Sequence, residues 1–173
     1  MGWRWRPFGT RYSRTARRLC ANVRMDGGRK GDGMSIKDRL TKLHRIVIRT
    51  RFNGMCFVPG CGCGCDTAHL VSKGSNPHWR WEYENGVLAC RIHHGQLDGQ
   101  DTAHPPAEMH EIIRLRYPRR YGWMQEYQNK SAPPWTMDQL ESKERELKMT
   151  INELKLHMPC RSLAMLGDEE IGI

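Results

Sequence analysis

The chain has 173 residues and a formal charge of +9, from 28 Lys and Arg against 19 Asp and Glu. Nine basic side chains and one acid fall within residues 1–30, so residues 31–173 are close to neutral. No apolar run approaches the ~18 residues of a membrane helix, and no apolar stretch typical of a secretory signal stands at the N-terminus. We therefore expect no membrane association and a cytoplasmic location, where seven cysteines favour metal binding over disulfides.

Residues 1–34 are rich in Arg and Gly and poor in aliphatic side chains. Such a segment buries too little surface to offset its chain entropy, so we expect a basic disordered arm. A second hypothesis makes Met34 the start of translation. Gly31-Asp32 can be encoded as GGAGA, which resembles a bacterial ribosome-binding site, and residues 1–33 would then be an untranslated extension.

Residues 36–51 are predicted to form an amphipathic helix with Ser35 as its N-cap and Asn53-Gly54 at its end. Its apolar side chains recur at steps of three and four residues: Ile36, Leu40, Leu43 and Val47. The other face is either simply solvated or tracks phosphate groups. That face carries Lys37, Arg39, Lys42, Arg45 and Arg49.

A loop rich in Cys and Gly over 54–66 precedes a segment in which we expect two short strands and two helices. The second expected strand is suggested by the alternation in His78-Trp79-Arg80-Trp81-Glu82, with turn residues before it. Pro106 is expected to open the last helix of this stretch and Pro118 to limit it. The expected elements are, in chain order, strands at 67–71 and 78–83, a helix near 91–98 and a helix over 106–120.

After a Pro-containing linker at 131–134, residues 136–158 are predicted to form a heptad-like helix, and 159–173 a flexible tail. Glu144 interrupts the seam of apolar heptad positions. The seam either packs onto the rest of the chain or joins two copies in a homodimer. Its members are Met137, Leu140, Leu147, Ile151, Leu154 and Met158.

Four cysteines lie within ten residues, and a fifth is followed closely by two histidines. Thiolate and imidazole ligands at such spacings suit a tetrahedral zinc ion, with Pro59-Gly60 making the turn between the first two ligands. The predicted structural zinc ligands are Cys56, Cys61, Cys90 and His93. Cys63 or Cys65 could replace Cys61, and a set of buried or redox-active thiols is the alternative to zinc.

The string DTAHLVSKG…RWEYENGVLACRIHHGQLDG resembles the HNH nuclease motif. It is most similar to the phage-borne HNH and NinG-type recombination endonucleases, over 56–98 and more loosely, through Tyr121-Gly122, to about 128. The resemblance implies an α+β fold: a small zinc-stabilised ββα-metal (HNH) unit, flanked by α-helices within a nuclease domain over 35–130. It also implies a phage-encoded enzyme in a bacterial host cell.

The resemblance assigns three catalytic roles. His69 matches the general base that takes a proton from water, and Asn85 matches the residue that holds the hairpin loop and orients that base. His94 matches the ligand of one catalytic divalent cation, Mg²⁺ or Mn²⁺. General chemistry agrees, because hydrolysis of a phosphodiester needs an activated water and a cation near the leaving oxygen.

Three positions depart from the family pattern. Ala68 stands where an Asp or His usually precedes the base, and Asp98 stands where many members have a second His. Because Asp98 shares a helix face with His94, we expect both to bind the catalytic cation, with Asp66 as a weaker third ligand. His93 replaces the usual Cys as a zinc ligand.

These residues together predict a metal-dependent HNH endonuclease that hydrolyses DNA, with Arg80 and Lys73 as phosphate contacts. Trp79 and Trp81 are expected in the hairpin core rather than as base-stacking platforms. The remaining histidines are expected at the surface or in packing: His44, His78, His104, His110 and His157. The alternatives are an inactive zinc-dependent DNA-binding module and a recombination or packaging factor that binds partners through 136–158.

Overall fold

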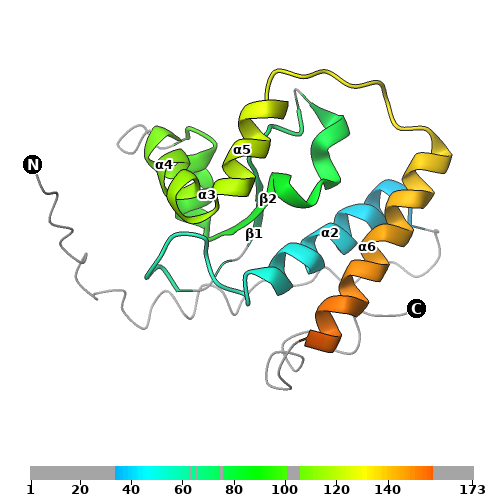
Figure 1. Cartoon of the computed structure of the whole chain (residues 1–173), viewed down its shortest axis with the longest axis horizontal. Coiled ribbons are helices and arrows are strands. Elements are labelled where there is room, and N and C mark those ends of the chain that lie inside the picture. Colours follow the sequence, from blue (N-terminus) through cyan, green and yellow to red (C-terminus); the bar gives the residue numbers. More distant parts are fainter. Residues whose placement is uncertain (1–33, 63, 65, 75, 101–105, 158–173) are drawn as a thin grey trace, which may run out of the picture. The chain divides into compact units, whose positions relative to one another are not determined.

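A computed structural model describes residues 34–62, 64, 66–74, 76–100 and 106–157 (Figure 1). The expectations for 1–33, for Cys63 and Cys65, for His104 and for the tail at 159–173 lie outside these residues. The described part combines helices with a small two-stranded sheet, so the α+β class is confirmed. Among the described helices, none has the length and apolar character needed to cross a membrane.

Helix α2 (Ile36–Arg51) has the predicted bounds. The Ser35 side chain caps its first turn by accepting a hydrogen bond from the Asp38 amide at 3.2 Å. At the other end, Asn53 and Gly54 adopt positive φ angles of 49° and 67°, a backbone conformation that cannot continue the helix.

Strands β1 (Asp66–His69) and β2 (Gly86–Ala89) pair antiparallel, with Asp66 opposite Ala89 and His69 opposite Gly86. All four residues of β2 are buried, so the strand has no polar face and no alternating pattern. Ile48 of α2 lies so close to Gly86 that a Cβ atom there would come within 2.7 Å of it. Glycine is therefore required where the helix crosses the sheet.

The prediction of a strand at 78–83 is wrong. This segment forms the 3₁₀ helix η1 (Pro77–Trp81), followed by η2 (Tyr83–Asn85). Its apolar side chains alternate because they face different neighbours: the Trp79 indole donates to the Lys130 carbonyl, and the Trp81 indole donates to the Thr41 hydroxyl. Trp81 is buried, although in the contact with α2 and not in a hairpin.

Helix α3 (Arg91–Leu97) follows β2 directly, close to the expected bounds. The single helix expected over 106–120 is instead two helices, α4 (Pro106–Arg116) and α5 (Pro118–Tyr127). Tyr117 between them leaves helical geometry at φ −132° and ψ 58°, because a proline restricts the residue before it. Pro118 therefore starts a helix rather than only ending one.

Helix α6 (Met137–His157) runs beside α2 (Figure 1). Its buried heptad residues pack against α2 and Trp81: Leu140, Leu147, Ile151 and Leu154. Glu144, which interrupts the seam, pairs with Arg39 of α2 at 2.9 Å. The homodimer stays a prediction, and it would need a different face of α6, such as the exposed Met149 and Leu156.

A second core lies between the sheet and the helices that follow it. Phe57, Ala68, Val87 and Ile113 are almost fully buried there together with the edge of the cysteine loop. Helix α2 and helix α3 both contact the two strands, and α4 packs against α3. These contacts fix the ends of β1 and β2 relative to the start of α3.

Candidate functional site

Three cysteines and one histidine come together from two segments that the β1–β2 sheet separates. Cys56 and Cys61 lie in the loop after α2, while Cys90 is the N-cap of α3 and His93 stands in its first turn. The four ligand atoms lie within 4.8 Å of one another, and among the described residues no other set of three or more His, Cys, Asp or Glu gathers in this way.

The distances inside this Cys3His cluster suit a tetrahedral ion. His93 Nδ1 lies 3.3 Å from Cys56 Sγ and 3.2 Å from Cys90 Sγ, and the Cys61 and Cys90 sulfurs are 3.5 Å apart. Bonds of about 2.3 Å to sulfur and about 2.0 Å to nitrogen would separate tetrahedral ligand atoms by roughly 3.5 Å. The sulfurs are much farther apart than the ~2.05 Å of a disulfide. The cluster can therefore hold a structural metal ion, and its chemistry suits zinc.

The loop that presents Cys56 and Cys61 is closed by the backbone. The Cys61 amide donates to the Val58 carbonyl at 3.3 Å, and the Cys56 amide donates to the Gly62 carbonyl at 2.9 Å. Gly60 adopts a φ of 75°, which a residue with a side chain rarely does, so Pro59-Gly60 does form the turn between the two cysteines. Hydrogen bonds from the Cys56 thiol and from His93 lower the pKa of Cys90, whereas the same contact with Cys90 and burial raise the pKa of Cys56.

Asn85, at the end of η2, is fully buried and holds the segment between the strands. Its Oδ1 accepts from the Val71 amide at 2.6 Å, and its Nδ2 donates to the carbonyls of Val71 and Trp79 at 3.1 and 2.8 Å. These bonds join both ends of 71–79, and the Asn85 carbonyl accepts from the amide of Leu70, the residue that follows β1, at 2.9 Å.

His69 is the last residue of β1, and its ring lies against the segment that Asn85 holds. Its Nε2 is 3.1 Å from the Arg80 carbonyl. A carbonyl only accepts, so Nε2 carries the proton and Nδ1 keeps a free electron pair. Burial lowers the pKa of His69 to about 4, and the cationic Lys73 and Arg80 act in the same direction. The ring is therefore neutral at physiological pH.

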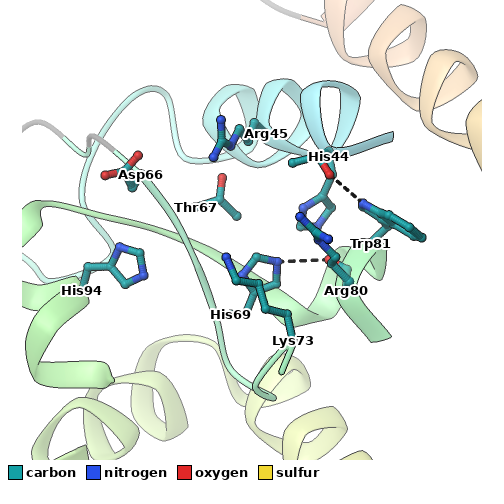
Figure 2. Close-up of a pocket in the computed structure, with 10 residues that line it drawn as sticks. His44, Arg45, Asp66, Thr67, His69, Lys73, Arg80, Trp81 and His94 are labelled. Carbon is teal, nitrogen blue, oxygen red and sulfur yellow. Dashed lines mark hydrogen bonds between the residues drawn. The ribbon is translucent and has the colours of Figure 1, made fainter. Parts of the chain in front are cut away.

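A pocket opens beside His69 (Figure 2). Its charged residues are three cations, Arg45, Lys73 and Arg80, and one acid, Asp66. This excess of positive charge favours an anionic ligand. The pocket is completed by Thr41, His44, Thr67, Trp81 and His94.

The expected ligands of the catalytic cation come together only in part. His94 Nε2 and Asp98 Oδ2 are 3.4 Å apart at one end of α3. Asp66, the exposed first residue of β1, lines the same pocket as His94 and His69, although the alternation of the strand separates it from His69. The three side chains do not form a set as tight as the Cys3His cluster.

Ala68 points away from this pocket. It is completely buried in the core between the sheet and α4, whereas its neighbours Thr67 and His69 line the pocket. The residue directly before His69 therefore contributes no side chain to the pocket.

The pocket also includes residues that the sequence did not single out. His44 of α2 is buried and donates through Nε2 to the Glu82 carbonyl at 3.1 Å. Its ring stacks on that of His69 with centroids 5.8 Å apart. The sequence held one sign of this: His44 follows Leu40 by four residues on the apolar side of α2.

Compared with known proteins, the chain matches no family model, no curated protein and no solved structure.

Proposed function

We propose that the protein is a metal-dependent endonuclease of the HNH type that hydrolyses DNA phosphodiester bonds. The observation that carries the proposal is His69: a neutral imidazole at the end of β1, oriented by a backbone carbonyl, inside a cationic pocket that it shares with His94 of α3. The order β1, β2, α3 and the bracing by Asn85 also fit the ββα-metal unit that the sequence motif implies.

His69 has the geometry of a general base. With Nε2 bound to the Arg80 carbonyl, Nδ1 is the nitrogen that can take a proton from an attacking water. The carbonyl also stabilises the ring once it is protonated. Thr67 lines the pocket from the same face of β1.

The cations of the pocket would bind the scissile phosphate. Arg80 and Lys73, the residues predicted to contact phosphate, both line the pocket from the segment after β1. Charge-assisted hydrogen bonds to a phosphate stabilise the negative charge that builds up during hydrolysis.

The chemistry of the expected cation ligands suits a hard divalent ion, and two of them, His94 and Asp66, line the pocket of His69. His94 offers an imidazole nitrogen and Asp98 a carboxylate oxygen 3.4 Å from it, with Asp66 on the same pocket. When bound, Mg²⁺ or Mn²⁺ would supply positive charge next to the leaving oxygen. In this proposal the Cys3His cluster holds a structural zinc ion that fixes the start of α3, and hence His94, against β1.

A plasmid-nicking assay tests the proposal. The full chain loaded with zinc should convert supercoiled plasmid to nicked circles when Mg²⁺ or Mn²⁺ is added. His69→Ala should reduce the rate at least about 100-fold, the usual contribution of a general base. His110→Ala on α4, outside the pocket, is the matched control and should keep the wild-type rate. Cleavage that survives in His69→Ala would contradict the assigned base.

One observation favours a second candidate, an inactive zinc-dependent DNA-binding module. Ala68 leaves the pocket without the usual acid, and Asp66, His94 and Asp98 do not gather tightly among the described residues. This candidate predicts DNA binding by the wild type with no nicking across Mg²⁺, Mn²⁺, Ca²⁺, Co²⁺ and Ni²⁺.

A further inference from the structure

Helix α2 carries a basic face beside the pocket that the proposed reaction does not explain. Lys42, Arg45 and Arg49 stand at positions i, i+3 and i+7, so they share one side of the helix. All three are exposed, and none forms an ion pair with any residue that the structure describes. Asp38 stands one turn earlier on the helix and bonds to the Ser35 hydroxyl, and Asp66 lines the same pocket as Arg45.

Arg39, another basic residue of α2, has a different role. Arg39 lies on the side that faces α6, where its guanidinium bonds to both carboxylate oxygens of Glu144 at 3.2 and 2.9 Å. That charge is already neutralised within the chain. The charges of Lys42, Arg45 and Arg49 remain available to an external anion.

Arg45 connects this face to the pocket. It lines the pocket from α2, whereas Lys73 and Arg80 line it from the segment after β1 (Figure 2). A phosphate in the pocket would therefore lie between cations from two elements, and the strand that carries it would leave along α2. A small anion would need only the pocket, so the extended basic face indicates a polymer of phosphates.

We propose that Lys42, Arg45 and Arg49 bind the sugar–phosphate backbone of the DNA strand that passes through the pocket. This inference rests on the proposed function, which places a DNA strand in the pocket. It concerns the binding of that strand and not its hydrolysis. Seven residues of helix span about 10 Å. At an axial spacing of about 3.4 Å per phosphate of one strand, this face matches about three phosphates.

Salt dependence of binding to a labelled 20-base-pair duplex tests the inference. The full chain loaded with zinc is used, without added Mg²⁺ or Mn²⁺, so that binding is measured without cleavage. In the triple variant Lys42→Gln, Arg45→Gln and Arg49→Gln, the slope of log K against log salt should become shallower by about 2.7. Between 50 and 200 mM salt, the wild type should then lose about 40-fold more affinity than this variant.

A matched triple variant controls for bulk charge. Arg114→Gln, Lys130→Gln and Lys148→Gln also remove three positive charges, from exposed side chains that are each paired with an acid. This control should leave the slope within about 0.9 of the wild type, which is less than one phosphate contact. Equal changes in the two variants would overturn the inference. The single variant Arg49→Gln, farthest from the pocket, should by itself reduce the slope by about 0.9.

The outcomes separate this inference from the proposed function. Duplex binding with the expected loss of slope in the α2 variant, but no nicking by the wild type, supports the inference and rejects the nuclease. Nicking by the wild type with an unchanged slope in the α2 variant rejects the inference and leaves the nuclease standing.

Discussion

At the scale of single residues, two neighbouring histidines line the pocket, and each is hydrogen-bonded to a different backbone carbonyl. His69 is oriented by the Arg80 carbonyl, and His44 by the Glu82 carbonyl, two residues further along. Their rings stack, so a charge on either one would be felt by the other. Both histidines are thus suited to the neutral state, and only His69 ends a strand at the pocket.

Acid should therefore destabilise the protein through His44. Burial lowers the pKa of His44 to about 3, and the charges of His69, Lys143 and Arg120 add to this effect. An unfolded histidine takes up its proton near pH 6.5, so the folded state loses stability as the pH falls from 6.5 towards 3. Between pH 7 and 5 the loss from this group should be about 2 kcal/mol.

Urea unfolding at a series of pH values measures this effect. His44→Gln cannot take up a proton, so its free energy of unfolding should fall less steeply with acid than that of the wild type. Loss of metal from the Cys3His cluster affects both proteins equally, which is why the difference between them is the relevant quantity. Parallel pH curves for the two proteins would show that His44 does not titrate as described.

Sequence reasoning singled out His69, Asn85 and His94 because a motif marks them, and it did not single out His44 because no motif does. Helical periodicity could place His44 on the apolar side of α2, but not show that this side meets β1 exactly at His69. Such a contact depends on how α2 crosses the sheet, which the close approach of Ile48 to Gly86 determines. No sequence pattern indicated that Arg120 is buried. Its guanidinium donates to the Tyr83 and Gly86 carbonyls.

At the scale of elements, helix α6 supports the pocket from a distance through Lys143. This side chain is only 6 % exposed, and its Nζ lies 3.0 Å from Glu82 and 2.9 Å from Glu146. Glu82 follows η1 and provides the carbonyl that binds His44. The ion pair thus joins α6 to the segment that orients both histidines.

Lys143→Met should destabilise the protein by about 1–3 kcal/mol, because it leaves the partly buried Glu82 carboxylate without its cation. Lys148→Met on the same helix is the control. Lys148 is 55 % exposed in its pair with Glu144, so its loss should cost less than about 1 kcal/mol. Chemical denaturation of the two variants measures the difference. Equal losses would mean that burial of Lys143 contributes nothing to the pair.

The helices were easier to predict than the strands. Caps and apolar spacing are local, so α2, α3 and α6 followed from Ser35, from the Cys90 region and from the heptad pattern. The second strand could not be predicted by alternation, because β2 is buried on both faces and Trp79 and Trp81 alternate for an unrelated reason. Pro118 was correctly placed at a boundary, but a proline both ends one helix and can begin the next.

At the scale of the whole molecule, the Cys3His cluster joins the loop after α2 to the start of α3. A structural zinc ion contributes on the order of 10 kcal/mol in small domains, which is comparable to the whole stability of a typical domain. Removing the metal should therefore unfold much of the chain rather than loosen one loop.

Zinc content and thermal unfolding of cysteine variants test this expectation. Cys56→Ser, Cys61→Ser and Cys90→Ser should each lose the bound zinc and show a broad or absent thermal transition. Cys63→Ser and Cys65→Ser are the matched controls from the same loop, and each should keep one zinc per chain. A full equivalent of zinc in Cys61→Ser would assign the fourth ligand to one of those neighbours.

The pairing of α2 with α6 has a consequence for synthesis on the ribosome. Every residue of the Cys3His cluster has been made once His93 is in the chain, whereas the apolar side of α2 finds its partner only when Leu154 has followed. At about 5–20 residues per second, this delay lasts several seconds. During that time Leu40 and Val47 are uncovered, so the nascent chain should be most prone to chaperone binding just before its last helix emerges.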